Sequence, residues 1–126
     1  MIRVLVDTSV WVAHFRQRNT TLVELLLLDS ALMHPMVLGE IACGTPPTRA
    51  TTIADLQRLQ PASAASLAEV LAFVEREQLF GLGCGLVNLT LLASTLLTPG
   101  ARLWTLDKRL AALAERFGAA HRSAVH

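Results

Sequence analysis

Two aspartates, Asp7 and Asp107, stand where carboxylates commonly bind ligands in α/β proteins. Each directly follows a short apolar run, at 2–6 in one case and at 102–106 in the other. Each also precedes a segment whose apolar residues have helical spacing. Because ligands of open α/β sheets gather at the carboxyl ends of the strands, we expect both carboxylates at one edge of a sheet. The alternative is that each aspartate only caps the helix after it, since Asp is a favoured N-cap residue.

A glutamate and an asparagine interrupt apolar helical stripes in the middle of the chain. The residues three and four positions from Glu40 are apolar or small: Met36, Val37, Cys43 and Gly44. This spacing predicts that the Glu40 carboxylate points inward, where it needs a cation, several donors or a raised pKa. An ion pair with an arginine is the alternative. Asn88 has Leu91 and Leu92 at the same spacing, so its amide is also predicted to face inward, with a hydrogen-bonded core asparagine as the alternative.

These side chains form a ligand set made only of oxygen: Asp7, Glu40, Asn88 and Asp107. The set lacks the His and Cys that zinc prefers, and hard oxygen ligands suit Mg²⁺ or Mn²⁺. Three hydroxyl residues lie near the acids in sequence: Thr8, Ser9 and Thr105. Their hydroxyls can hold carboxylates by hydrogen bonds, as the outer partners of a metal site do. Ordinary turn and strand chemistry is the alternative.

The elements that must position these residues alternate between strands and helices. We predict strands at 2–6, 31–34 and 102–106, and helices at 9–15, 20–29, 35–43, 48–59, 63–78 and 86–97. A glycine-spaced loop covers 81–85, and a final helix starts at Asp107 and ends before Gly118. This order implies a parallel sheet with right-handed crossovers, in one domain over 1–126 with a tail that frays from about 119. We expect Trp11, Trp104 and the apolar run 25–28 to pack inward.

Composition excludes several classes of protein. Hydrophobic residues make up 52% and charged residues 17%, which does not suit a disordered chain or a coiled coil. The formal charge is +1, so a nucleic-acid or membrane partner must meet a local patch. Cys43 and Cys84 lie far apart and form no paired motif, so we expect free, buried thiols and a cytoplasmic location.

The sequence argues against both export and membrane insertion. Asp7 falls inside the apolar stretch that a signal peptide would need, so we expect no export. The stretch 79–101 carries no charge and is long enough to be considered as a membrane span. Clustered glycines open it and Pro99-Gly100 closes it, which favours a glycine turn followed by a buried helix and predicts no membrane partner.

Four segments give the chain a family resemblance: VLVDTSVW at 4–11, GEIA at 39–42, LLAS at 91–94 and ARLWTLDKRL at 101–110. The chain resembles the PIN-domain ribonucleases and, within them, the VapC toxins of bacterial toxin–antitoxin pairs. The resemblance covers nearly the whole chain, and the last segment is the most specific. It implies a PIN-like three-layer α/β/α sandwich in which a short parallel sheet is flanked by helices.

The resemblance also implies a metal site. Acids at the positions of Asp7, Glu40 and Asp107 bind Mg²⁺ or Mn²⁺ in this family, with a further aspartate on the helix after the glycine loop. Here that position holds Asn88, so the formal charge of the site is −3 where the full set would give −4. An amide oxygen still binds a metal or its water but contributes no charge. We expect weaker metal binding.

The implied activity is endonucleolytic cleavage of single-stranded or loop RNA by a metal-activated water. Asp7 and Asp107 would be ligands, Glu40 a ligand through water or the base, and Asn88 a group that orients water. Basic residues predicted near the metal edge are candidates for phosphate contacts, although each also suits a solvated surface: Arg16, Arg18, Arg49, Lys108 and Arg109. The resemblance implies two protein partners, a cognate VapB-type antitoxin and a second copy in a homodimer.

Two other functions compete with a ribonuclease toxin. Asn88 favours a catalytically impaired member that keeps the fold, binds its antitoxin and acts as a co-repressor. A strand-end aspartate such as Asp7 also occurs in aspartyl-phosphate phosphatases and receiver domains. Such a protein needs a second carboxylate beside it, and this chain has Thr8 and Ser9 there instead.

Overall fold

Strand β1 (Arg3–Val6) lies inside a four-stranded parallel sheet with the order β3-β2-β1-β4. The computed structural model describes residues 2–122. The other strands are β2 (Ala31–Met33), β3 (Gln60–Pro61) and β4 (Ala101–Trp104). In β1, Leu5 stands beside Leu32 of β2 and Leu103 of β4, and Val6 stands beside Trp104. Strands β1 and β4 therefore end together.

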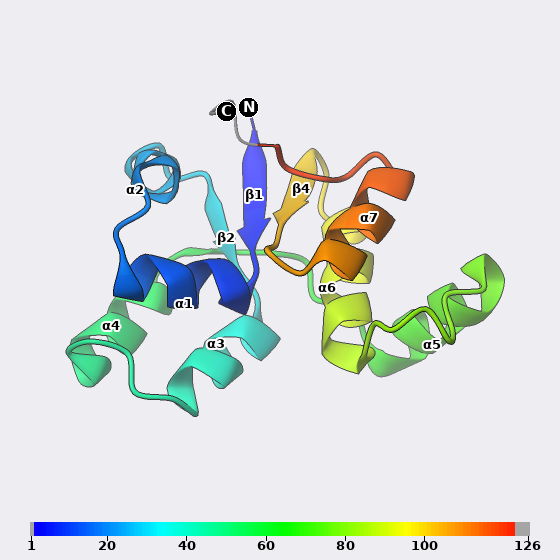
Figure 1. Ribbon diagram of the computed structural model, residues 1–126, viewed down its shortest axis with the longest axis horizontal. Coiled ribbons are helices and arrows are strands. Elements are labelled where there is room, and N and C mark those ends of the chain that lie inside the picture. The colour runs from blue at the N-terminus through cyan, green and yellow to red at the C-terminus, as the bar shows by residue number, and fades with distance from the viewer. Residues whose placement is uncertain (1, 123–126) are drawn as a thin grey trace.

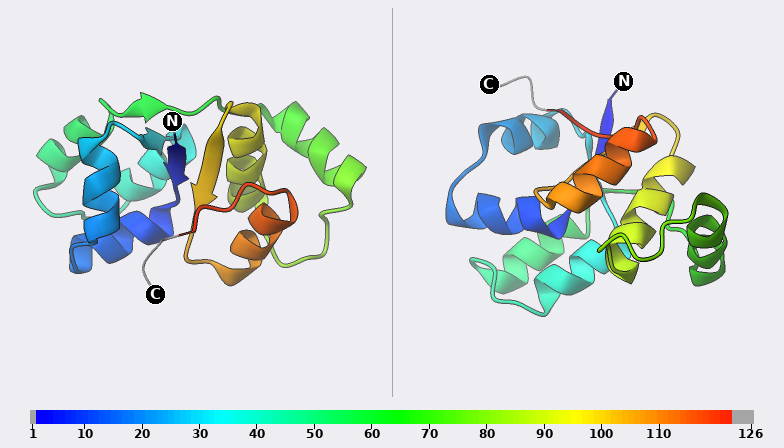
Figure 2. Two further views of the ribbon diagram at one scale, coloured as in Figure 1. Left: turned by 90° about the horizontal axis from the view of Figure 1, so that it is seen from above. Right: turned by 45° about the vertical axis from the view of Figure 1, so that its right-hand side comes forward.

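Helices fill the connections between the strands. They are α1 (Thr8–Arg16), α2 (Thr20–Leu27), α3 (Pro35–Ala42), α4 (Arg49–Leu56), α5 (Leu67–Glu77), α6 (Leu86–Leu97) and α7 (Lys108–Arg116). Figures 1 and 2 show α1 to α4 on one side of the sheet and α5 to α7 on the other. The three-layer α/β/α prediction is confirmed.

The strand order places a topological switch point between β1 and β4. The chain moves outward from β1 through β2 to β3, and then returns to the opposite flank of β1 for β4. The connecting helices change sides of the sheet at the same step (Figure 2). In open α/β folds the crevice at such a point, at the carboxyl ends of the strands, is where ligands bind. Asp7 and Asp107 follow these two strands.

The core lies between the sheet and the two helix layers. Val4, Leu5 and Val6 are fully buried, as expected for a central strand covered on both faces. Trp11 and Trp104 are 2% and 9% exposed, which confirms their predicted packing. Among residues 2–122, no helix has the length and apolar character needed to cross a membrane.

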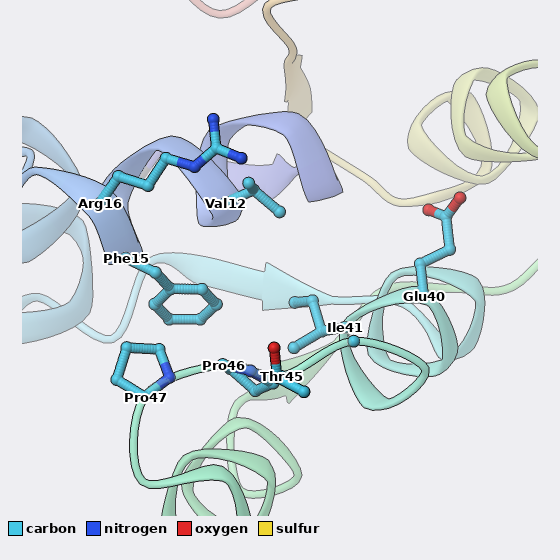
Figure 3. Close-up of a pocket in the computed structure, with 9 residues that line it drawn as sticks. Val12, Phe15, Arg16, Glu40, Ile41, Thr45, Pro46 and Pro47 are labelled. Atoms are coloured by element: carbon cyan, nitrogen blue, oxygen red, sulfur yellow. The ribbon is translucent and has the colours of Figure 1, made fainter.

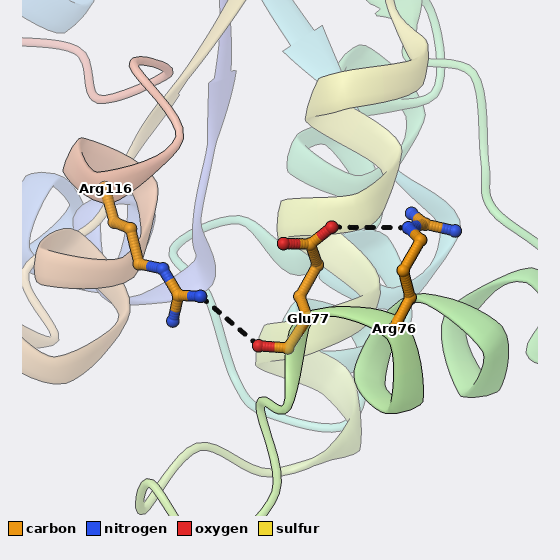
Figure 4. Close-up of polar contacts among 3 residues, drawn as sticks. All are labelled: Arg76, Glu77 and Arg116. Atoms are coloured by element: carbon orange, nitrogen blue, oxygen red, sulfur yellow. Dashed lines mark hydrogen bonds and ion pairs between the residues drawn. The ribbon is translucent and has the colours of Figure 1, made fainter.

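The outer helix α5 is tied to α7 at one end (Figure 4). Arg116 donates from Nη2 to the backbone carbonyl of Glu77 over 3.2 Å, and Arg76 pairs with the Glu77 carboxylate over 3.3 Å. Phe73 and Phe117 pack beneath these groups with ring centroids 5.4 Å apart. Exposed ion pairs contribute little to stability, so the aromatic contact holds this end of the layer.

Two predicted boundaries are wrong around Pro61. No strand was predicted between the helices at 48–59 and 63–78, but Gln60–Pro61 forms β3. Helix α5 begins at Leu67 rather than at 63. Proline is tolerated in β3 because this strand is at the edge of the sheet and needs no donor on its outer side. Ser66 accepts from the Glu69 amide and forms a capping box with it, which sets the helix start.

The predicted fraying from about 119 is wrong for the first residues of the tail. Ala119 is buried, and its carbonyl accepts from the Leu103 amide over 2.7 Å. The His121 amide then donates to the Leu103 carbonyl over 2.9 Å, so this segment pairs along the free edge of β4. The part of the prediction that concerns 123–126 lies outside the described residues.

Two predictions of burial are also wrong. In the apolar run 25–28, Leu25 is buried, but Leu27 and Leu28 are 80% and 68% exposed because α2 ends there and turns them outward. Cys43 is exposed and Cys84 is half-buried, although both were expected inside. Hydrophobic type alone did not identify the buried face.

Candidate functional site

Asp7 and Asp107 lie at the same edge of the sheet, after the paired strands β1 and β4. Asp7 follows β1 directly, whereas β4 ends at Trp104 rather than at the predicted 106, so two residues precede Asp107. The Asp7 amide continues the ladder between them by donating to the Trp104 carbonyl over 2.9 Å. Neighbouring parallel strands thus deliver both aspartates to the switch point, although 100 residues separate them in the sequence.

The Asp7 carboxylate is buried, with 6% of the residue exposed. Its Oδ2 accepts from Ser9 Oγ and from Thr105 Oγ1, both over 2.7 Å. It forms no side-chain cap of α1, so the capping alternative fails for Asp7. Within residues 2–122 it also has no ion pair. A buried carboxylate held by two hydroxyls and not neutralised by a cation has the character of a ligand-binding group.

The two hydroxyls that hold Asp7 are themselves held by the loop after β4. Ser9 Oγ accepts from the Leu106 amide over 3.1 Å, and Thr105 Oγ1 accepts from the Asp107 amide over 3.0 Å. Each hydroxyl therefore receives a backbone proton and donates its own to Asp7. We call this set, residues 7, 9 and 105–107, the strand-end network.

Asp107 combines two roles that the sequence left as alternatives. Its residue is exposed, and its Oδ1 accepts from the amides of Arg109 and Leu110 over 2.9 and 3.0 Å. This contact is an N-cap of α7, so capping is confirmed here. Oδ2 accepts no hydrogen bond from residues 2–122. Capping therefore orients the Asp107 side chain through Oδ1 and leaves Oδ2 available to a ligand.

The prediction that Glu40 points inward is wrong. Helix α3 buries Val37 and Ile41 and exposes the opposite face, which carries Glu40 with Met36 and Cys43. Apolar side chains on an exposed face produced the misleading pattern. Glu40 Oε1 accepts from Thr8 Oγ1 over 2.6 Å, which joins α3 to the residue next to Asp7. Neither the inward position nor an arginine partner applies to the described structure.

Asn88 lies in the first turn of α6, just after the glycine loop, and is half-buried. Leu91 and Leu92 on the same helix are fully buried, as the pattern predicts. The Asn88 amide forms no hydrogen bond with residues 2–122, so the alternative of a hydrogen-bonded core asparagine fails. No contact in the structure links it to the strand-end network either.

The acids suit a cation that needs few protein ligands. Among the described residues no three His, Cys, Asp or Glu side chains are placed to hold one metal ion together. Zinc requires such a set, but Mg²⁺ is usually bound through one or two carboxylates and keeps several waters. The remaining carboxylate oxygens, Oδ1 of Asp7 and Oδ2 of Asp107, accept no hydrogen bond from residues 2–122. Such hard oxygen ligands fit Mg²⁺ or Mn²⁺.

All five basic residues predicted near the site are exposed: Arg16, Arg18, Arg49, Lys108 and Arg109. Arg49 is not free, because it donates to the carbonyls of Ala42 and Gly44 at the end of α3, over 2.5 and 3.3 Å. Arg109 lies against Gly83 of the glycine loop. Burial raises the pKa of the half-buried Cys84 thiol; the charge of Asp107 raises it further, and Arg109 opposes this. Asp107 and Arg109 are therefore near one another and the loop.

A groove of about 430 Å³ runs beside Glu40 (Figure 3). Glu40 stands at one end, and Phe15, Arg16 and Pro47 lie toward the other. The groove is lined by Val12, Phe15, Arg16, Glu40, Ile41, Gly44, Thr45, Pro46 and Pro47. This groove was not predicted from the sequence. The signal for it, apolar residues on the outer face of α1, becomes visible only when α1 and α3 are placed together.

The fold and the site define the class of protein: a PIN-like α/β domain with carboxylates at the switch point between β1 and β4. Ribonuclease VapC32 of Mycobacterium tuberculosis, in strains CDC 1551 / Oshkosh and ATCC 25618 / H37Rv, is 44% identical to this chain over 117 residues. The match covers 93% of this chain and 94% of the relative. This chain belongs to the VapC family of PIN-domain proteins, which confirms the resemblance. No family model matches it.

Proposed function

We propose that this protein is an endoribonuclease toxin that depends on Mg²⁺ or Mn²⁺ and is paired with a VapB-type antitoxin. The observation that carries the proposal is the Asp7 carboxylate, which is buried at the switch point, held by two hydroxyls and not paired with a cation in the described structure. Ribonuclease activity in a relative of 44% identity supports the substrate class.

In the proposed mechanism Asp7 and Asp107 hold the cation, and Ser9 and Thr105 fix the orientation of Asp7. When bound, the ion would make water more acidic and offset charge on the phosphate. Glu40 has Oε1 occupied by the Thr8 hydroxyl, which leaves Oε2 to accept the proton of the attacking water. The new bond joins water oxygen to phosphorus, and the bond to the ribose oxygen breaks.

RNA binding would rest on charge rather than on stacking. The exposed basic residues can contact phosphates, which supply most of the nonspecific affinity for nucleic acid. The chain has no tyrosine, and both tryptophans are buried, so it offers few flat side chains to unstacked bases. This arrangement suits a nuclease whose target is chosen by RNA shape.

We place the antitoxin in the groove beside Glu40. Its apolar lining would be covered by the apolar face of a peptide, while Arg16 and Glu40 at its margin would pair with opposite charges. A segment bound there would lie over Glu40 and block access to the acids. A second copy of the chain is the other proposed partner, and large apolar side chains exposed on the surface would supply the contact.

Asn88 favours a second candidate function. Since it replaces an acid of the family pattern, this second candidate is a protein that retains the fold and the antitoxin partner without efficient cleavage. The groove and the exposed apolar surface serve this function equally well. The two candidates differ in one measurable property, which is RNA cleavage by the isolated protein.

The test is a cleavage assay with antitoxin-free protein and structured RNA. We expect cleavage with Mg²⁺ or Mn²⁺, and none in chelator or with Asp7→Ala. Asp55→Ala, which removes an exposed carboxylate of α4 that takes no part in these contacts, serves as the matched control and should cleave normally. Cleavage that persists both in chelator and in Asp7→Ala would reject the metal mechanism.

Asn88→Asp tested beside the wild type decides between the two candidates. Added charge should raise the affinity for Mn²⁺ in calorimetry and strengthen growth arrest on expression. Asn88→Ala separates the effect of charge from the loss of the amide. If wild type does not cleave and Asn88→Asp does, the impaired-member function is correct. If neither property changes, Asn88 lies outside the site.

A further inference from the structure

The glycine loop before α6 contains one glycine that contacts a charged side chain. Gly83 has a φ of +85°, and a Cβ built on it would lie 2.5 Å from Nη1 and 2.9 Å from Cδ of Arg109. Gly81 also has a positive φ, of +73°, but a Cβ there would meet nothing within 4 Å. The positive φ favours glycine at both positions. Only at Gly83 would an added Cβ also displace a neighbouring side chain, that of Arg109.

This contact places the Arg109 guanidinium against the glycine loop, while the backbone of Arg109 stays bonded to Asp107. Arg109 is in the first turn of α7, and its amide donates to Asp107 Oδ1 over 2.9 Å. The side chain then crosses to the loop, next to Cys84, where the charges of Asp107 and Arg109 both act on the thiol. The ion pairs within residues 2–122 are Arg76 with Glu77 and Arg122 with Glu115. Within residues 2–122 the Arg109 guanidinium therefore forms no ion pair, although the residue is two positions from Asp107 and its amide bonds that carboxylate.

A phosphate that approaches the acids needs such a cation. Three carboxylates repel an RNA backbone, and a guanidinium on the neighbouring glycine loop would offset part of that repulsion. A guanidinium also binds two phosphate oxygens at once, which a solvated lysine does not. Because Arg109 lies against Gly83, less side-chain freedom is lost when the phosphate binds.

We propose that Gly83 is a positioning residue, whose missing side chain lets Arg109 lie across the loop and contact an RNA phosphate beside Asp107. This inference rests on the proposed RNA substrate. It assigns a role to one glycine of the loop and predicts that the glycines are not equivalent.

The test compares Gly83→Ala with Gly81→Ala, which has the same kind of backbone strain and no contact with Arg109. The probe is a fluorescently labelled single-stranded RNA, bound in the presence of chelator so that the metal does not contribute. We expect Gly83→Ala to weaken binding roughly tenfold, the size of one charge-assisted hydrogen bond, and Gly81→Ala to leave it unchanged. The slope of log affinity against log salt should fall by about 0.7 for one lost phosphate contact.

Combination with Arg109→Ala separates positioning from general damage. In the Arg109→Ala background, Gly83→Ala should weaken RNA binding no further, because there is no guanidinium left to displace. Removal of the Arg109 side chain should also restore part of the thermal stability that Gly83→Ala loses, and this measurement works even where Gly83→Ala alone folds poorly.

The outcomes separate this inference from the proposed function. If wild-type protein binds RNA and Gly83→Ala behaves like Gly81→Ala, the positioning role is overturned and the ribonuclease proposal stands. Equal losses of affinity and stability from Gly83→Ala in both Arg109 backgrounds would overturn it as well. Wild-type protein that neither binds nor cleaves RNA would overturn both.

Discussion

The candidate site has two halves that are held in different ways. In the strand-end network, the hydrogen bonds of Ser9 and Thr105 join segments that are 97 and 98 residues apart in sequence. In the helix-borne half, Glu40 is held by one exposed hydrogen bond, and Asn88 by none within residues 2–122. The first half is fixed by the sheet itself. The second half depends on how two helices are placed against it.

This difference has a physical cause in the elements. Strands β1 and β4 end in register, so the residues after them meet without help from other side chains. A residue on α3 or α6 reaches the same place only through the angle of its helix and its own rotamer. We therefore expect substitutions in the strand-end network to have large effects on both activity and stability, and those in the helix-borne half to act mainly on activity.

The largest effect is expected for Asp7→Asn. The amide retains the shape of the side chain but removes the charge that would bind the cation. Activity should fall by more than the roughly 10–100-fold that loss of an outer partner of a metal ligand typically costs. The measurement is kcat/KM for RNA at saturating Mg²⁺, with Asp55→Asn as the control. Near-normal activity would show that the buried carboxylate of Asp7 is structural.

Thr105→Val should lower stability and activity together. It removes the hydroxyl that donates to Asp7 Oδ2 and accepts from the Asp107 amide. A lost hydrogen bond to a buried charged group costs about 1.5–3 kcal/mol of unfolding free energy, measurable as a lower midpoint of urea denaturation with unchanged slope. Thr105→Ser keeps the hydroxyl and should retain most of both properties. If Thr105→Val and Thr105→Ser have the same stability and the same activity, the Thr105 hydroxyl does not hold Asp7.

The sequence was sufficient to predict the strand-end half. Short apolar runs followed by Asp, with hydroxyl residues beside them, indicated strands, their carboxyl ends and the side chains that hold Asp7. These features are local, and parallel pairing brings them together by a rule that holds for most α/β sheets. The missed strand β3 is two residues long and contains Pro61, so no local pattern marks it.

The helix-borne half was harder to predict, because the face that a helix buries is decided by its neighbours. Glu40 has apolar residues around it on α3, yet Val37 and Ile41 face the core and Met36 faces solvent. The same reasoning failed for Leu27 and Leu28 of the α2 region. In a protein whose surface is partly apolar, the composition of a helical stripe does not show which way it points.

The two halves should also differ in their response to acid. His34 directly follows β2 and caps α3. Its Nδ1 accepts from the Met36 amide over 3.0 Å, and its Nε2 is 2.9 Å from Ser94 Oγ. Burial lowers the pKa of His34 below its usual 6.5. The unfolded chain therefore takes up a proton at a pH where the folded chain does not, so stability is present above about 6.5 and is lost as the pH falls below it.

Protonation of Nδ1 would also remove the cap from the helix that carries Glu40. The Met36 amide should exchange hydrogen faster at pH 5.5 than at pH 7.5, after correction for intrinsic rates, and the Asp7 amide should change less. His34→Asn retains a capping oxygen and cannot be protonated, so it should reduce the pH dependence of stability while lowering stability at pH 7.5. A pH dependence as steep as that of wild type would assign the acid sensitivity to His14 and His121, whose pKa values burial also lowers.

The smallest effect is expected for Thr8→Val, which removes the one bond that orients Glu40. Both residues are accessible to water, so the free energy of unfolding should change by less than about 1 kcal/mol. Activity should still fall, by up to roughly tenfold, because Glu40 loses its preferred orientation. Thr8→Ser restores the hydroxyl and should recover the rate, whereas a Thr8→Val enzyme that loses stability instead would place Thr8 with the strand-end network. Glu40→Gln removes the proposed base. In that background Thr8→Val should lower the activity no further. Such non-additive losses of activity would identify the orientation of Glu40 as the role of Thr8.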